Sequence, residues 1–162
     1  MNLDEVPALL AGFRDKAAAA AGPVANAMAD TYRHHLTRVT LQRYHSVPGQ
    51  FGTDSPAFEG PVASRTGRLA ASVTSWQGAS GPGFGSASVA PHTIYAVTQE
   101  WGEVHYARTR KYMHWVNSGG EWWKKRVEIP PRPYMRTATK ETIADGSLTR
   151  AAMYKFVSIT GL

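Results

Sequence analysis

Cysteine is the first absence in this chain of 162 residues. Without cysteine, neither a disulfide framework nor a cysteine-ligated metal site can form. No apolar run approaches the roughly 18–20 residues that cross a bilayer, and the acidic start, Met1 to Glu5, lacks the basic-then-apolar order of a secretion signal. We therefore expect a protein that folds without oxidising conditions and has no membrane partner.

Sequence patterns typical of enzymes are also missing. There is no Gly-x-Ser-x-Gly turn and no phosphate-binding glycine loop, because the glycine-rich segment 78–85 leads into a strand pattern and not into a helix. No pair of histidines has zinc-protease spacing. A cluster of Glu100, His105 and His114 across strands is the remaining option, but a lone strand histidine is far more often an ordinary surface or core residue. We expect no enzyme activity, no cofactor and no metal.

The composition is that of a folded protein, with a hydrophobic fraction of 43% and five Trp, seven Tyr and five Phe. Its length is most simply one domain, large enough to bury a core. Lys and Arg number 18 against 12 Asp and Glu, which gives a net charge of +6. Such a charge is compatible with contact to nucleic acid or to an acidic protein surface and establishes neither.

The pattern along the chain predicts an α+β fold, with an antiparallel sheet of four to five strands and helices from both ends packed on one face. Residues 1–45 are expected to be helical, and 46–64 read as a loop whose length suggests a function or ordering by a partner. The sheet and its hairpin are expected over 65–129, the C-terminal helix over 130–157, and a tail over 158–162.

Within the helical parts, the alanine-rich stretch 6–21 favours helix, and Gly22-Pro23 is expected to interrupt or kink it. Apolar residues then recur every three or four positions as far as Val39, which predicts an amphipathic helix. Near the C-terminus, Asp145-Gly146-Ser147 is expected to break the helix, with Ser147 capping a last short one.

The strands are expected where apolar and polar residues alternate. Asn117-Ser118-Gly119-Gly120 is a good hairpin turn, and 78–83 is a glycine-rich segment between two expected strands. The expected strands are Leu69–Trp76, Ser86–Ala90, Ile94–Trp101, Tyr112–Val116 and Trp122–Ile129.

Three short segments read as joints of the fold. In the first, Arg65 to Leu69, Thr66 and Gly67 predict a turn with positive φ. In the second, Ile94 to Gly102, a strand runs into Gly102. In the third, Ile129 to Ala138, Pro133 opens a helix, because proline at the first helical position costs no hydrogen bond.

Together these segments resemble the tail-completion, or virion morphogenesis, proteins that join head to tail in long-tailed bacteriophages. The resemblance covers about residues 60–140 and implies a tail-terminator-like fold and a non-enzymatic protein of the virion neck, made in the cytoplasm of the bacterial host. It further implies a ring, commonly of six subunits, between the head connector and the tail tube, in contact with neighbouring neck and tail-tube proteins. DNA would pass through the lumen without specific binding.

Three charged residues are candidates for contacts between subunits. Glu100 can pair with Arg132 or Arg136 of its own or a neighbouring chain, or it can be an ordinary surface carboxylate. Arg132 lies between two prolines, which already restrict its backbone, so little backbone freedom is lost when its guanidinium docks on a carboxylate. We therefore hypothesise a Glu100–Arg132 contact between subunits.

A basic and aromatic segment is the candidate surface for docking a partner. Aromatic and arginine side chains mark protein interfaces, while interleaved cations and rings also serve single-strand nucleic-acid binding. For this segment we favour protein docking over nucleic-acid binding. For the whole protein, the alternatives to a tail-completion protein are a tail terminator or a head-completion stopper ring and, from another class, a small basic DNA-binding accessory protein. The candidate docking residues are Arg108, Arg110, Tyr112, Trp115, Trp122 and Trp123.

Overall fold

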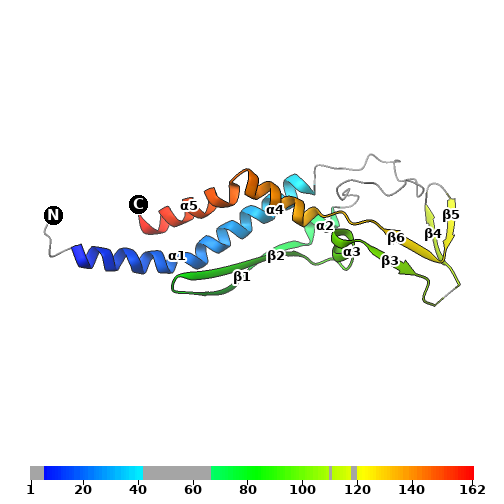
Figure 1. The fold of residues 1–162 in the computed structure, drawn as a ribbon, viewed down its shortest axis with the longest axis horizontal. Helices are drawn as coiled ribbons and strands as arrows, with labels where there is room; N and C mark the ends of the chain where they lie inside the picture. The colour runs from blue at the N-terminus through cyan, green and yellow to red at the C-terminus, as the bar shows by residue number, and fades with distance from the viewer. Residues whose placement is uncertain (1–5, 42–66, 110, 118–119) are drawn as a thin grey trace. The chain divides into compact units, whose positions relative to one another are not determined.

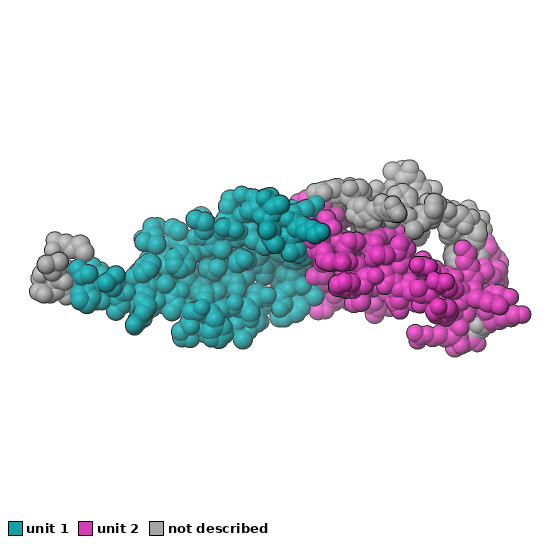
Figure 2. Space-filling model, viewed as in Figure 1, with its two compact units in different colours: residues 1–35, 73–90, 139–162 teal, residues 36–72, 91–138 magenta. Residues whose placement is uncertain are grey.

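The computed structural model describes residues 6–41, 67–109, 111–117 and 120–162, with the backbone alone for 115–117, 120 and 122. Over this part the chain is α+β, as predicted, with a long N-terminal helix, short antiparallel sheets and C-terminal helices. It divides into two compact units (Figure 2): unit 1 contains residues 1–35, 73–90 and 139–162, and unit 2 contains 36–72 and 91–138. The expectation of a single domain stays a prediction.

Unit 1 is built on α1, which spans Val6–His35 and contains Pro23. The predicted interruption at Gly22-Pro23 therefore does not end the helix. Proline removes one hydrogen bond of the helical ladder and bends the chain, and in Figure 1 the helix changes direction partway along. The residues that α1 buries are small: Ala20, Gly22 and Ala29.

A hairpin of two strands lies against α1 in unit 1 (Figure 1). It consists of β1, Val73–Gly81, and β2, Phe84–Pro91. The glycine-rich segment 78–83 is thus mostly strand, and only Pro82 and Gly83 make the turn, where Gly83 has a φ of 79°. The Gly83 N–H donates to the Ala18 carbonyl oxygen at 3.0 Å, which attaches the tip of the hairpin to the helix.

The backbones of β2 and α1 approach each other closely at Gly85. A Cβ at this position would overlap the Ala21 carbonyl oxygen and lie 2.6 Å from the Gly22 Cα. Burial alternates along β2, with residues 85, 87 and 89 less exposed than 84, 86 and 88. The contact therefore requires glycine at 85 on the face that meets the helix.

The C-terminal helices complete unit 1. α4 spans Tyr134–Ala144, with its first five residues in unit 2, and α5 spans Ser147–Thr160. α5 lies along α1 in Figure 1, and the Tyr32 hydroxyl accepts from the Thr139 hydroxyl at 3.3 Å. The predicted break between the helices is confirmed, but the predicted tail is wrong, since α5 continues to Thr160 and ends at Gly161 with a φ of 77°.

The start of α5 is capped differently from the prediction. Ser147 makes no side-chain cap; instead the Asp145 Oδ1 accepts from the Ser147 N–H at 2.7 Å. This backbone hydrogen bond lowers the pKa of Asp145. A lowered pKa means that the contribution of the carboxylate to stability is present near neutral pH and is lost as the pH falls through the lowered value.

Unit 2 contains short elements. They are the π-helix η2, Leu36–Thr40; the helices α2, Arg68–Ala71, and α3, Ala96–Trp101; and the strands β3, Glu103–Tyr106, β4, Met113–Asn117, β5, Gly120–Lys124, and β6, Arg126–Ile129. Its buried hydrophobic residues come from its helices and from the turn after η2: Leu36, Leu41, Leu69, Ala96, Tyr134 and Ala138.

The single sheet of four to five strands is not present in the described residues. They form three two-stranded sheets: β1 with β2, β3 with β6, and β4 with β5. The hairpin of β4 and β5 is confirmed, with Trp115 opposite Trp122. β3 was not predicted, and it pairs antiparallel with β6, Glu103 opposite Ile129.

Three predicted strands are wrong in whole or in part. The predicted strand Trp122–Ile129 is divided, because the residues up to Lys124 belong to β5 and β6 begins at Arg126 in another sheet. Residues 69–71 belong to α2, and the strand begins only at Val73. The predicted strand Ile94–Trp101 is mostly the helix α3, whose buried residues, Ala96 and Glu100, are four positions apart. None of the described helices combines the length and the apolar character that a membrane span requires.

Candidate functional site

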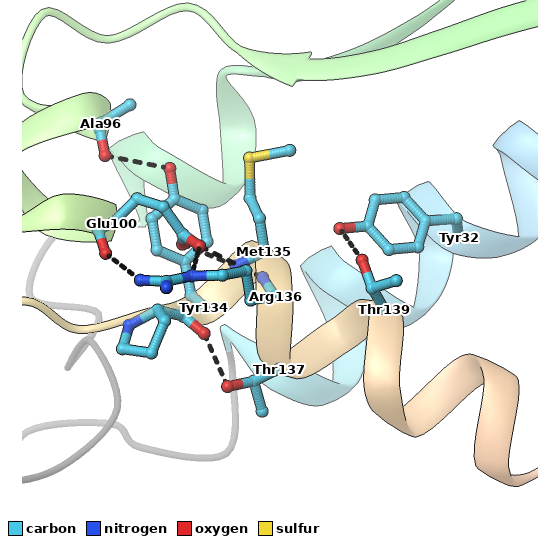
Figure 3. Close-up of polar contacts among 9 residues, drawn as sticks. Tyr32, Ala96, Glu100, Tyr134, Met135, Arg136, Thr137 and Thr139 are labelled. Carbon is cyan, nitrogen blue, oxygen red and sulfur yellow. Dashed lines mark hydrogen bonds and ion pairs between the residues drawn. The ribbon is translucent and has the colours of Figure 1, made fainter.

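The second and third joint segments meet in unit 2 at the carboxylate of Glu100 (Figure 3). Glu100 lies near the end of α3 and is 5% exposed. Its oxygens accept from the backbone N–H groups of Met135 at 2.9 Å and Arg136 at 3.2 Å, in the first turn of α4. The first N–H groups of a helix have no partner within it and carry partial positive charge. Glu100 therefore caps α4 from another helix.

The Arg136 side chain closes over this carboxylate. Its Nε lies 3.0 Å from the Glu100 Oε1, and a terminal nitrogen donates to the Glu100 carbonyl oxygen at 3.0 Å. The guanidinium also lies over the Trp101 ring, 4.3 Å from its centroid, which is a cation–π contact. Of the pairings considered from the sequence, the chain makes the one between Glu100 and its own Arg136.

Gly102 allows the two segments to approach. It ends α3 with φ 73° and ψ 161°, and a Cβ there would lie 2.8 Å from both the Ile129 carbonyl oxygen and the Pro131 nitrogen. The prediction that a strand ends at Gly102 is wrong, because the element that ends there is the helix α3. Because glycine has no Cβ, the end of β6 can pass close to the end of α3 at this position.

Two further contacts complete this structure, which we call the Glu100 joint and define by Glu100, Gly102, Tyr134 and Arg136. The Tyr134 side chain is 1% exposed, and its hydroxyl donates to the Ala96 carbonyl oxygen at 3.3 Å. The Arg132 N–H donates to the Gln99 carbonyl oxygen at 2.7 Å. Pro133 directly precedes α4, and its carbonyl accepts the Thr137 N–H at 3.0 Å, so the predicted helix start is confirmed to within one residue.

Arg132 is not part of the ion pair. Its Nε is buried and has no hydrogen-bond partner among the described residues. Both oxygens of Glu100 accept hydrogen bonds from its own chain. The Glu100–Arg132 contact between subunits stays a prediction, and it would require Glu100 to accept a further donor.

The first joint segment lies elsewhere in unit 2. Gly67 has a φ of 68° and precedes α2, as the predicted turn requires. The Ser72 hydroxyl donates to the Leu69 carbonyl oxygen at 2.8 Å, and the Ser72 carbonyl accepts the His92 N–H at 3.1 Å. The segment thus sets where β1 begins. Thr66 lies outside the described residues, as do the predicted loop 46–64 and Arg110.

Those candidate docking residues that the structure describes lie on β4 and β5 or in the segment before β4. Trp123 is 56% exposed, and its ring stacks on His114 with centroids 4.0 Å apart. The Nζ atoms of Lys111 and Lys125 each lie 5.7 Å from the centroid of Tyr112. Arg108 is exposed. Trp115 and Trp122 are described by their backbone alone.

Carboxylates accompany the cations on this surface, which we call the aromatic hairpin and define as residues 106–126. Here His114 Nε2 lies 3.6 Å from a Glu121 oxygen. In the neighbouring sheet of β3 and β6, an oxygen of Glu128 accepts from Arg126 at 3.1 Å and His105 lies 3.5 Å from Glu103. Mixed charge and exposed rings suit recognition of a protein surface.

The structure does not bring Glu100, His105 and His114 together. The first caps α4, and the two histidines have separate carboxylate partners. Among the described residues no group of three His, Asp or Glu side chains is placed to hold a metal ion.

The comparisons with known proteins add no relative, since no family model, curated protein or solved structure matches the chain. Sequence reasoning missed the Trp101 contact with Arg136 and the exposed apolar residues at the start of α1. The second of these had a visible signal, because Leu9, Leu10 and Phe13 interrupt an otherwise alanine-rich helix.

Proposed function

We propose that this chain is a structural protein of a bacteriophage virion, in the neck, where it completes the tail and joins it to the head. In this proposal its subunits form a ring, commonly a hexamer, between the head connector and the tail tube. The resemblance of the three joint segments suggests the family, and the contacts of the Glu100 joint are consistent with two of those segments defining one fold.

The observation that carries the proposal is the distribution of apolar side chains. Among the described residues sixteen large hydrophobic side chains are exposed, while nine hydrophobic residues are buried, four of them alanine. Contiguous exposed apolar patches mark interaction sites, and Leu9, Leu10 and Phe13 lie together in the first turns of α1. Burial between subunits supplies the missing core, as it does in obligate assemblies.

We also propose that the larger sheet predicted from the sequence forms between subunits. A two-stranded ribbon is marginally stable by itself and has open edges that can pair with another chain. Pairing between the ribbons of neighbouring subunits would give the four to five strands that the described residues of one chain do not form in a single sheet. The aromatic hairpin would then dock on the next neck or tail-tube protein.

Mass measurement tests the ring. At assembly concentrations, native mass spectrometry of the purified chain is expected to give one closed oligomer near six subunits, because the apolar surface favours association. Adding the neighbouring tail proteins is expected to give a larger complex of fixed stoichiometry. A chain that remains monomeric both alone and with those proteins would contradict the proposal.

A DNA-binding accessory protein is the second candidate, favoured by one observation: Tyr112 lies between the cations of Lys111 and Lys125. A salt titration separates the two. If the aromatic hairpin docks on protein, the affinity for duplex and single-stranded DNA should depend weakly on salt, with a log–log slope smaller than about 2, because few phosphates are contacted. A slope of about 5 or steeper that is lost in Lys111→Ala/Lys125→Ala would favour the DNA-binding protein.

A further inference from the structure

The first part of α1 is exposed to solvent. Every residue from 7 to 16 is exposed, although all are helical. We call this segment the N-terminal arm. Its large apolar side chains are Leu9, Leu10 and Phe13, which are 58%, 64% and 39% exposed. A helix of about ten residues is only marginally stable in water without packing, so a partner that covers the arm would stabilise its helical conformation.

The apolar side of the arm continues a face that is buried further along the same helix. Val6, Leu10, Phe13, Ala17 and Ala20 follow one another at alternating spacings of four and three residues, the repeat that keeps side chains on one line for helix packing. Ala20 is fully buried. The arm thus exposes the same kind of surface that is buried further along the helix.

Unit 1 also contains an open and mostly apolar hollow. The hollow lies between α1, β2 and the C-terminal helices and has a volume of about 520 Å³. Most of its lining is apolar, with small residues such as Ala25 and Ala87 and the larger Met28, Val89 and Leu148. The polar residues in the lining are Tyr32, Ser86 and Thr139. A volume of this size accommodates more than one large side chain.

We propose that the N-terminal arm of one chain inserts Leu10 and Phe13 into this hollow on a second copy. The arm cannot reach the hollow of its own chain, since Leu10 and Ala25 lie on one helix, fifteen residues or about 22 Å apart. The occupant is therefore another chain. Convex apolar side chains on a helix and a concave apolar lining match the helix-in-groove mode of recognition.

An interface between two different surfaces is heterologous, so each chain gives an arm to one neighbour and receives an arm from another. Repetition of such a contact closes into a ring or extends as a filament. The inference rests on the proposed ring and names the surface that holds it. The ring itself can also form through the aromatic hairpin or the open strand edges. An experiment can therefore contradict the arm contact and leave the proposed ring standing.

Cysteine cross-linking tests the contact directly, because the native chain has no cysteine. Leu10→Cys and Ala87→Cys are made as single variants and as one double variant, and each is treated with a short bismaleimide. The double variant is expected to give a ladder of cross-linked species up to the ring size. An equimolar mixture of the two single variants is expected to give cross-linked dimers, and each single variant alone is expected to give none.

The outcomes are distinct. A dimer formed by Leu10→Cys alone would mean that two arms pair with each other and would overturn the hollow as the binding site. Absence of cross-links in the double variant, together with a closed oligomer of the unmodified chain, would overturn the arm contact and leave the ring. A wild-type chain that is monomeric and gives no cross-links would overturn both.

A charge substitution provides an independent measure of the contact. Leu10→Glu, at an exposed position that leaves the fold intact, is expected to raise the dissociation constant for self-association by about thirtyfold or more. Tyr154→Glu is the matched control, since Tyr154 is 81% exposed on α5 and does not line the hollow; it should change the constant less than about threefold. Equal effects of both substitutions would overturn the proposal.

Discussion

Replacement of Glu100 by alanine is expected to lower the free energy of unfolding by about 3 kcal/mol. For a chain of this length that corresponds to a fall in melting temperature of about 6–12 °C. Thermal and urea unfolding followed by circular dichroism would measure both quantities. The effect is large because one carboxylate serves two backbone N–H groups and one guanidinium.

The N–H groups of Met135 and Arg136 account for most of this loss. They lie at the first turn of α4, and without the carboxylate they have no acceptor in the helix, so a cap and its interaction with the helix dipole are lost together. The ion pair with Arg136 contributes less, because that side chain is 49% exposed and solvent screens exposed pairs. Glu100 thus acts mainly as a cap.

Two variants separate these contributions. Glu100→Gln keeps one acceptor oxygen and places an NH2 group against the helix N–H groups, so it should lose about half of the stability that Glu100→Ala loses. Glu128→Ala removes a glutamate of an exposed pair with Arg126, for which we expect a loss of less than about 0.5 kcal/mol. If all three variants had equal stability, the Glu100 joint would not be what holds α4.

Substitution of Gly102 by alanine is the second large effect, with an expected loss of about 2–4 kcal/mol. Two costs add. A φ of 73° with a ψ of 161° is a backbone conformation that is essentially restricted to glycine. The new Cβ would also press against the Ile129 carbonyl oxygen and Pro131, which are backbone and ring atoms that cannot rotate away.

Gly12→Ala is the matched control for this measurement. Gly12 lies within α1, and a Cβ there meets nothing within 4 Å, so alanine should stabilise the helix by about 0.5–1 kcal/mol. Opposite signs for the two substitutions in chemical denaturation would locate the cost at the joint. A Gly102→Ala variant as stable as the parent would show that the backbone there can relax.

Local patterns predicted the parts of the fold whose partners are close in sequence. The hairpin of β4 and β5, the alternation of β6 and the break near Gly146 all follow from turn residues and spacing. Residues 94–101 were misjudged because a run rich in Ile, Tyr, Val and Trp favours strand. The helix that forms there instead buries Ala96 and Glu100 on one side, and that burial depends on Tyr134, which is far along the chain.

The sequence identified the residues of the Glu100 joint, but it did not predict that Glu100 caps α4 of its own chain. Glu100, Gly102 and Arg136 were selected from the sequence, and a Glu100–Arg136 pair was one of the options. No sequence rule places a glutamate at the start of a helix 34 residues away, because capping rules concern neighbours in the chain. The single sheet failed for a similar reason, since strand patterns do not say which strands pair.

The close approach at Gly85 fixes the hairpin of β1 and β2 at one position along α1. A shift by one residue would turn the opposite side of β2 toward the helix, and a shift by two would bring Ala87, which has the Cβ that the contact excludes. Gly85 therefore sets the register of both hairpin strands along the helix. Lengthening the turn at Pro82 and Gly83 changes how far the hairpin extends, and the strand residues that follow Gly85 keep their places against the helix.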